Sequence, residues 1–361
     1  MRWRTAVVVL GSWVCSSCAP SGFADPTQIE SVRILASSAD TPYVKPGSQV
    51  TVHVLAYDNR PSKPEPMTIS WLKFPCTDPQ DDAYYSCFQQ FGSQAKDGGA
   101  AGPALDAGGA GGGDGGGLAG AFVTGPSATF QVPPDAVTMH PPQAGAQVPY
   151  GLVFMFNVAC AGEIRPTPID PSNQNPQAVP IGCFDAKGNQ LGPDDWVLGY
   201  TRVYAYDSLT NANPVISYVD VNGQKLALTQ GDGPQTYEAP ACDAGAGCLS
   251  MSPCTSSDQD RCQVKIGPVV PSSSWELNPE QTDVNGNPLH EEIWADFYSS
   301  VGQVQYSARL LYDPSTGSIG GPDTTNNNFQ PPGSPSQGYI WIVVHDNRSG
   351  AAWVTIPVSI R

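Results

Sequence analysis

The residues of this chain best suited to catalysis are its four histidines, and none of them stands in a catalytic sequence pattern. His290 precedes two glutamates, but a zinc protease needs a second histidine four residues further on, and position 294 is Trp. His53 falls on the outer side of a predicted strand, His140 precedes two prolines and His345 opens a predicted turn, so we expect these three to be structural or solvated. G-x-S-x-G, P-loop and dinucleotide-binding motifs are also missing. We therefore expect no enzyme and no catalytic residue. A hydrolase whose histidine and hydroxyl meet only in the folded chain stays as an alternative.

One loop has the residue types that bind calcium. Asp283, Asn285 and Asn287 place carboxylate and amide oxygens at alternate positions, and two glutamates follow at 291 and 292. The loop lacks the full twelve-residue calcium pattern with its terminal glutamate. An Asn-Gly turn explains the same residues, so calcium is the weaker interpretation, and we expect no other cofactor. Asp323 with the three asparagines at 326–328 is a second polar loop of this kind.

A pair of adjacent aromatic residues is the candidate for ligand stacking. Tyr84 and Tyr85 lie between Cys76 and Cys87, in a short segment expected to be exposed. Aromatic rings on a surface can stack on sugars, although ordinary loop packing explains the pair as well. Trp71 and Trp341 sit among inward-facing apolar residues, so we expect them in the core.

Charge excludes whole classes of ligand. The chain has 33 acidic and 17 basic residues, a formal net charge of −16, and no run of Lys or Arg. Such a surface repels polyphosphates, so we expect no nucleic-acid and no nucleotide partner. Only 14% of the residues are charged, whereas Gly and Pro number 38 and 36. This composition argues against long amphipathic helices and favours strands joined by many turns.

The N-terminus has the features of an export signal. Arg2 and Arg4 precede the apolar run 6–10, which is too short to span a bilayer, and Ser16 and Ser17 precede Cys18. This arrangement resembles bacterial lipoprotein precursors, which are cut before a cysteine that then carries fatty acids such as palmitate. The resemblance implies a signal peptide at 1–18 and lipid attachment at Cys18. Ala19, instead of the Asp that retains lipoproteins at the inner membrane, implies the outer membrane or cell surface.

The alternative is cleavage after Gly22-Phe23-Ala24, which would release a soluble secreted or periplasmic protein. Loss of residues 1–18 removes two arginines and no acids, so the mature formal charge is −18. We expect the lipid to attach the protein to its membrane, because an acidic surface does not adsorb to anionic lipids.

Eight cysteines remain after the signal region, an even number in a chain expected to meet an oxidising compartment. Disulfides are therefore the predicted state, with local pairing of the first four and a separate knot formed by the last four. Sequence alone does not choose among the 105 connectivities that eight cysteines allow. The candidates are Cys76, Cys87, Cys160, Cys183, Cys242, Cys248, Cys254 and Cys262.

Apolar residues alternate with a period of two wherever the chain is hydrophobic, which predicts β-strands at 49–57, 68–74, 151–160 and 200–206. The Pro-Gly-led strand at 49–57 and the strand that carries Trp71 resemble the second and third strands of an immunoglobulin-type sandwich. Residues 98–120 contain 12 glycines in 23 residues, and we expect this insertion to be disordered.

A fresh alternation begins at 215, after Asn213 and Pro214. The chain ends in a predicted hairpin, 339–344 and 352–360, in which Pro357 suggests an edge strand. This hairpin resembles the last two strands of immunoglobulin-like domains in bacterial surface proteins. Asp58-Asn59-Arg60 and Asp346-Asn347-Arg348 end two predicted strands with the same three residues.

We therefore expect an all-β chain of two immunoglobulin-like β-sandwich domains with long loops, at 27–212 and 213–361, after a linker at 19–26. Three smaller domains, with a further break near Pro141, are the alternative. We expect a non-catalytic surface lipoprotein that serves as a structural, adhesive or binding module, with a surface protein or polysaccharide as its partner. A carbohydrate-binding or polysaccharide-processing component is the main alternative, because a fold of this kind implies no chemistry by itself.

Overall fold

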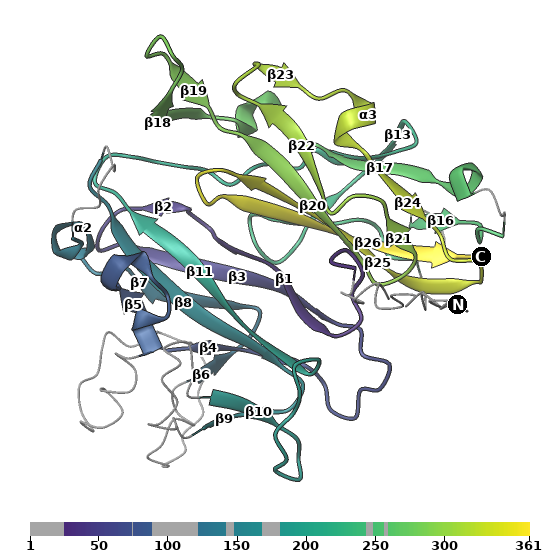
Figure 1. The fold of residues 1–361 in the computed structure, drawn as a ribbon, viewed down its shortest axis with the longest axis horizontal. Helices are drawn as coiled ribbons and strands as arrows, with labels where there is room; N and C mark the ends of the chain where they lie inside the picture. Colours follow the sequence, from purple (N-terminus) through teal and green to yellow (C-terminus); the bar gives the residue numbers. More distant parts are fainter. Residues whose placement is uncertain are drawn as a thin grey trace, which may run out of the picture.

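The structure is a computed structural model, and it describes residues 25–73, 75–88, 122–141, 148–167, 181–242, 248–255 and 259–361. The predicted signal peptide with Cys18 and the glycine-rich insertion 98–120 lie outside the described residues. Strands dominate, and they form two sandwiches (Figure 1), so the prediction of an all-β, immunoglobulin-like chain is confirmed.

The first sandwich has a small and a large sheet. The small sheet has the order β1-β3-β7 and contains β1 (Val32–Ala39), β3 (Gln49–Asp58) and β7 (Ser127–Gln131). The large sheet has the order β2-β11-β8-β4-β6 and contains β2 (Tyr43–Val44), β11 (Trp196–Ala205), β8 (Gly151–Cys160), β4 (Thr68–Leu72) and β6 (Phe122–Thr124). The short strand β5 (Cys76–Thr77) also pairs with β8. β2 runs parallel to the last strand, β11, as in immunoglobulin folds.

The first core is formed by residues that the predicted alternation placed on the inner faces of the strands. Val50 and Val52 in β3 are buried and pack with Trp71 of β4, whose indole Nε1 donates to the carbonyl of Gly125 at 2.9 Å. β8 differs from a half-buried strand because all ten of its residues are buried. Its outer residues, such as Phe154 and Phe156, are covered by the segment that the Cys76–Cys87 disulfide closes.

The second sandwich also has two sheets. The smaller one has the order β13-β12-β17-β24-β21, with β13 (Gln224–Leu226), β12 (Tyr218–Val221), β17 (Val264–Val269), β24 (Asn327–Gln330) and β21 (Gln303–Val304). The larger one has the order β14-β15-β26-β25-β20-β22-β23, with β14 (Thr229–Gln230), β15 (Thr236–Glu238), β26 (Ala351–Ile360), β25 (Ser336–Asp346), β20 (Ile293–Ser299), β22 (Ala308–Asp313) and β23 (Ser318–Ile319). Phe297, Phe329 and Ile342 are fully buried in the core between them.

The predicted C-terminal hairpin is β25–β26, but its second strand is not at an edge. β26 pairs with β25 on one side and, on the other, with β15 and with β16 (Leu249–Met251), both in parallel. Pro357 is tolerated because these two short strands pair with residues 353–355 and 358–360, and neither pairs with Pro357 itself. The edge interpretation of Pro357 is therefore wrong.

Smaller elements decorate both sandwiches. Two hairpins project from them, and the remaining elements are single helical turns (Figure 1). The hairpins are β9 (Glu163–Pro166) with β10 (Ile181–Phe184), and β18 (Leu277–Thr282) with β19 (Pro288–His290). The turns are η1 (Gln80–Asp82), α2 (Ala136–Met139), η4 (Gln259–Cys262), η5 (Ser272–Ser274) and α3 (Pro322–Thr325). In the described part of the chain, no helix is long and apolar enough to cross a membrane.

In the described part of the chain the structure has the disulfides Cys76–Cys87, Cys160–Cys183 and Cys254–Cys262. The first two are the local pairs predicted from the sequence, and the third lies within the predicted C-terminal group of four. Cys242 and Cys248 are both partly exposed, and their pairing stays a prediction.

The two sandwiches lie side by side, with β1 and β3 of the first against β25 and β26 of the second (Figure 1). Trp341 is only 2% exposed and packs with Ile29 and Leu35, its ring 4.5 Å from that of Tyr57. A second apolar cluster joins Ala36 to Val343 and Trp353. Trp341 is thus buried as expected, but between the sandwiches instead of inside one. An apolar contact of this kind favours a fixed arrangement of the two.

Candidate functional site between the two sandwiches

The predicted calcium loop is the turn of the β18–β19 hairpin. Asp283 Oδ1 accepts hydrogen bonds from the backbone N–H groups of Asn285 and Asn287, both at 2.8 Å, and its Oδ2 accepts from Asn287 Nδ2 at 3.0 Å. These hydrogen bonds hold the pKa of Asp283 below its usual value. No group of three or more metal-ligating side chains occurs among the residues that the structure describes. The turn interpretation therefore accounts for the geometry, and calcium stays a hypothesis.

The two predicted stacking tyrosines are in contact with each other but differ in exposure. Tyr84 stacks on Tyr200 of β11, with ring centroids 4.9 Å apart, and meets Phe88 edge-on. Tyr85 is 37% exposed and touches Tyr84 edge-on at 5.9 Å. One face of Tyr84 is therefore occupied by packing, and Tyr85 is the ring available to a ligand. A sugar site here stays a prediction.

Three of the four histidines contact a carboxylate or a backbone carbonyl. His140 Nε2 lies 2.8 Å from Asp82 Oδ1, and His345 Nε2 lies 3.2 Å from Asp296 Oδ2. His290 Nδ1 contacts the carbonyl of Trp275 at 2.8 Å. Within the described residues, none of the four histidines has a Ser, Thr or Cys side chain as a hydrogen-bond partner. The structure does not bring the predicted residues together as a nucleophile and its base.

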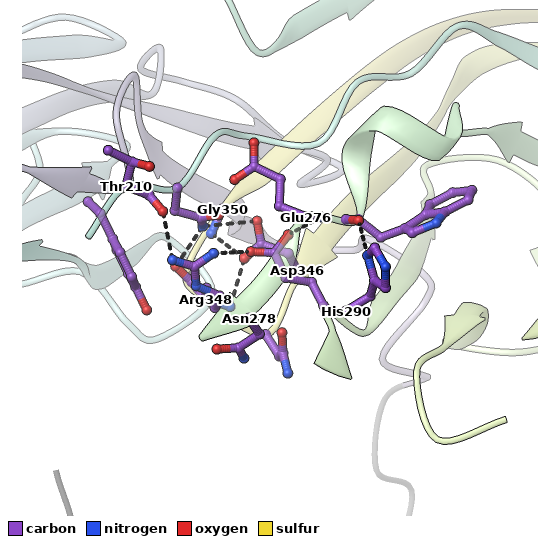
Figure 2. Close-up of polar contacts among 12 residues, drawn as sticks. Thr210, Glu276, Asn278, His290, Asp346, Arg348 and Gly350 are labelled. Atoms are coloured by element: carbon purple, nitrogen blue, oxygen red, sulfur yellow. Dashed lines mark hydrogen bonds and ion pairs between the residues drawn. The ribbon is translucent and has the colours of Figure 1, made fainter. Parts of the chain in front are cut away.

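A buried polar cluster that the sequence did not single out lies at the junction of the two sandwiches (Figure 2). Arg348, in the turn between β25 and β26, is its centre. Arg348 Nη1 donates to Glu291 Oε1 at 2.8 Å, and Nη2 donates to the carbonyl of Thr210 at 2.6 Å. The guanidinium also lies 4.7 Å from the ring centroid of Tyr43. One arginine thus contacts the first sandwich, the connecting segment and the second sandwich.

Asp346 builds the turn that presents Arg348. Its Oδ1 accepts from the backbone N–H groups of Arg348 at 2.8 Å and Gly350 at 2.7 Å. Its Oδ2 accepts from Asn211 Nδ2 at 3.2 Å, and Asn211 also donates to the carbonyl of Arg348 at 3.0 Å. The aspartate therefore fixes the turn and holds the connecting segment against it.

The β18–β19 hairpin is tied to the first sandwich by a second set of contacts. Tyr43 and Tyr206 both donate through their hydroxyls to the carboxylate of Glu280, at 3.1 and 3.2 Å. At the base of the hairpin, Glu291 accepts from the backbone N–H of Glu276 at 3.2 Å through its second oxygen. Burial and the neighbouring Glu280 raise the pKa of both tyrosines, so both remain protonated donors.

The junction is closed to solvent. Glu291 is 0% exposed, Asp346 2% and Arg348 3%. Burial, followed by the charge of Asp346, raises the pKa of Glu291 to about 7, although Arg348 opposes this shift. Burial also raises the pKa of Asp346. A carboxyl group with a pKa near 7 suits a general acid, but a substrate has no access to Glu291. Arg348, Glu291 and Asp346 therefore hold the two sandwiches and the connecting segment together, and we call these three residues the clamp.

A similar arrangement of an aspartate and an arginine two residues later occurs in the first sandwich. Asp58 Oδ1 accepts from the backbone N–H of Arg60 at 3.1 Å, as Asp346 does from Arg348, and Arg60 Nη1 reaches a second carboxylate, Asp195, at 2.7 Å. The repeated Asp-Asn-Arg triplet was therefore the sequence signal for these two arrangements. What it did not reveal was the second carboxylate, 135 residues away for Arg60 and 57 residues away for Arg348.

Comparisons with known proteins assign no family to this chain, since neither a family model nor a curated protein matches it. Among solved structures, the D00-D0 domain of intimin aligns over 91% of this chain and 98% of its own, at 9% identity and a TM-score of 0.19. The tandem Ig repeats of Dlar align over 92% and 100%, at 10% identity and a TM-score of 0.19. Murine CEACAM1b aligns over 90% and 100%, at 9% identity and a TM-score of 0.18. TM-scores this low carry no argument about function.

Proposed function

We propose that this protein is an exported, non-catalytic lipoprotein whose two immunoglobulin-like sandwiches act as one rigid structural, adhesive or binding module. The buried junction is the observation that supports this role. Arg348 and Glu291 link three parts of the chain there, and elsewhere between the sandwiches Trp341 and Trp353 bury apolar surface. A fixed pair of sandwiches presents its loops in a constant geometry, which is what a binding platform requires.

The sequence at the N-terminus supports the location. Cleavage before Cys18, with acylation by palmitate or a similar fatty acid, would attach the module to the outer membrane and leave it at the cell surface. Its partners would then be the membrane, through the lipid, and a surface protein or polysaccharide through the sandwiches. A soluble secreted or periplasmic protein is the alternative.

The anchor is tested with Cys18→Ser and with a globomycin-type inhibitor of lipoprotein processing. Both treatments should abolish labelling with radioactive palmitate and release the protein from the membrane fraction. A mature N-terminus at Asp25, determined by mass spectrometry, would overturn the anchor. It would leave the module itself unaffected.

The non-catalytic role is tested with purified mature protein and panels of ester, peptide and glycoside substrates. We expect no turnover above that of heat-denatured protein. Turnover that is lost in His345→Ala or His140→Ala would overturn the proposal, because those two histidines have the nearest carboxylates. Lys187→Ala, an exposed position in the first sandwich, is the control variant.

A further inference from the structure

Three adjoining hollows in the second sandwich are lined by residues of β17, β22, β23 and α3. These elements lie near one another in the fold (Figure 1). The first and second share Asn326, the second and third share Leu311 and Gly320, and the first and third share Arg309. Their volumes are about 280, 240 and 330 Å³. We call these three adjoining hollows the groove, and each of their volumes lies close to the lower end of the range of roughly 300–1,000 Å³ that is typical of ligand sites.

Exposed apolar side chains are concentrated at this groove. Of the nine large hydrophobic residues that are exposed in the described part of the chain, Tyr306, Leu310 and Ile319 each line one of the hollows. Trp275 and Tyr218 line the middle hollow, and Trp275 is held flat against Tyr312, with ring centroids 4.8 Å apart and planes 7° apart. Gathered exposed apolar groups mark binding surfaces, and aromatic faces suit the C–H faces of pyranose rings.

The polar groups of the groove are held in place by hydrogen bonds. Arg309 Nε donates to the carbonyl of Asn326, and Nη2 to the carbonyl of Asp323, both at 2.9 Å. The guanidinium lies 4.3 Å from the ring centroid of Tyr306. Asn326 Nδ2 donates to Asp220 Oδ1 at 3.0 Å. Amides, carboxylates and aromatic rings that converge on one groove are the groups that recognise sugar hydroxyls and ring faces.

The first hollow is positively charged within an acidic sandwich, with two cations against one carboxylate, Asp323, whereas the carboxylates Asp220 and Asp313 line the second and third hollows. Residues 213–361 contain 15 acidic and six basic side chains. Lys265 and Arg309 line the first hollow, and Lys225 lies over the ring of Tyr218, which lines the second. Among the residues that the structure describes, the ammonium group of Lys265 pairs only with Asp323, 2.6 Å away, whose side chain is 87% exposed. Exposed pairs contribute little, so a ligand carboxylate can replace Asp323 as the partner of Lys265.

On the basis of the binding role proposed above, we propose that this groove binds an acidic saccharide: a chain of pyranose rings that carries carboxylates. The rings would lie against Trp275, Tyr218 and Tyr306, and a carboxylate would meet Lys265 and Arg309 in the first hollow. Charge complementarity at the first hollow selects the acidic sugar, because the two cations that line it outnumber its one carboxylate.

The test is a glycan array of neutral and uronate-containing oligosaccharides, followed by calorimetry with the best binder. We expect the wild-type mature protein to bind uronate-containing oligosaccharides and to bind neutral ones at least 10-fold more weakly. Lys265→Glu should weaken the acidic oligosaccharide at least 10-fold, and Tyr306→Ala should do the same. Both side chains are exposed, so both variants should keep the melting temperature of the wild type.

Two matched variants in the first sandwich serve as controls. Lys187→Glu makes the same charge change at an exposed lysine, and Tyr85→Ala removes a tyrosine of similar exposure, 37% against 42% for Tyr306. Binding that is lost in Tyr85→Ala but kept in Tyr306→Ala would overturn the groove and place the ligand at the first sandwich. Equal binding of neutral and acidic oligosaccharides, or none at all, would also overturn it. The anchoring and hydrolysis experiments would be unaffected, so the two proposals fail separately.

Discussion

Replacing Arg348 with methionine tests the clamp directly. Methionine retains an apolar stem in the space beside Tyr43 but removes the guanidinium that donates to Glu291 and to the carbonyl of Thr210. Two carboxyl groups, Glu291 and Asp346, would then be left buried without a cation. Removing one partner of a buried ion pair costs about 3–5 kcal/mol, because the remaining charge keeps its desolvation penalty. We expect Arg348→Met to lower the free energy of unfolding by up to that amount at pH 8, where Glu291 of the wild type is ionised.

The loss should depend on pH. The pKa of Glu291 is about 7 in the folded protein and near 4.5 without the fold, so the folded state favours the protonated form. This contribution is fully present below about pH 4.5 and is lost as pH rises through 7. Since one pKa unit corresponds to roughly 1.4 kcal/mol, Glu291 should lower the free energy of unfolding of the wild type by about 3 kcal/mol as the pH rises over this range. Arg348→Met raises the pKa of Glu291 further, so its effect should be larger at pH 8 than at pH 5. Glu291→Gln should remove most of the wild-type slope.

The assay is urea unfolding followed by tryptophan fluorescence at pH 5 and pH 8, because Trp341 and Trp353 lie in the interface. The control is Arg165→Met, which breaks an exposed pair with Glu163 and should cost no more than about 1 kcal/mol. If Arg348→Met costs less than 1 kcal/mol at both pH values, the junction is not a clamp. A larger cost at pH 5 than at pH 8 would refute the reasoning about Glu291.

Three further predictions concern the interface, the disulfides and the insertion. Trp341→Ala should cost about 3–5 kcal/mol and enlarge the radius of gyration in small-angle scattering, because the ring fills the space between the sandwiches; an unchanged radius would contradict a packed interface. Non-reducing peptide mapping should find no free thiol among the eight mature cysteines, Cys242 and Cys248 included, and any free thiol refutes the full disulfide framework. Deleting 98–120 should leave the melting temperature nearly unchanged, since the length of a loop contributes only a small closure entropy; a large fall would show that the segment is packed.

The strands were predictable because a sheet that buries one face imposes a period of two on the sequence. The alternation predicted that Val50, Val52 and Trp71 lie in the first core, and it predicted the C-terminal hairpin equally clearly. The local disulfides followed from short cysteine spacings. These features are set by residues close together in the sequence, or by the alternation of faces along one strand, so they can be read from the sequence alone.

Features that depend on two remote segments were not predictable in the same way. The alternation predicted that Trp341 is buried. In the sequence, however, a sheet face that packs against another sandwich looks the same as one that faces its own core, so the interface between the two sandwiches was not predicted. Arg348 looked like a residue of a polar turn, because its partner Glu291 is 57 residues away in the chain. The groove arises only when the segment from β22 to α3 lies beside β17, which brings Arg309 and Lys265 to the same hollow.

The position of the groove has a consequence for how an anchored protein would use it. Residues 27–29, which precede the first sandwich in the sequence, pair with β20 of the second sandwich. The backbone carbonyl of Ser299 accepts from the N–H of Ile29 at 2.9 Å, and the N–H of Ser299 donates to the carbonyl of Thr27 at 2.8 Å. If Cys18 is acylated, residues 19–26 span at most about 30 Å even when fully extended. The second sandwich would then be tethered close to the bilayer by its own contact with residues 27–29. The junction at Arg348 and the apolar contact at Trp341 would fix the first sandwich relative to that point, so loosening both contacts would free the first sandwich without moving the groove.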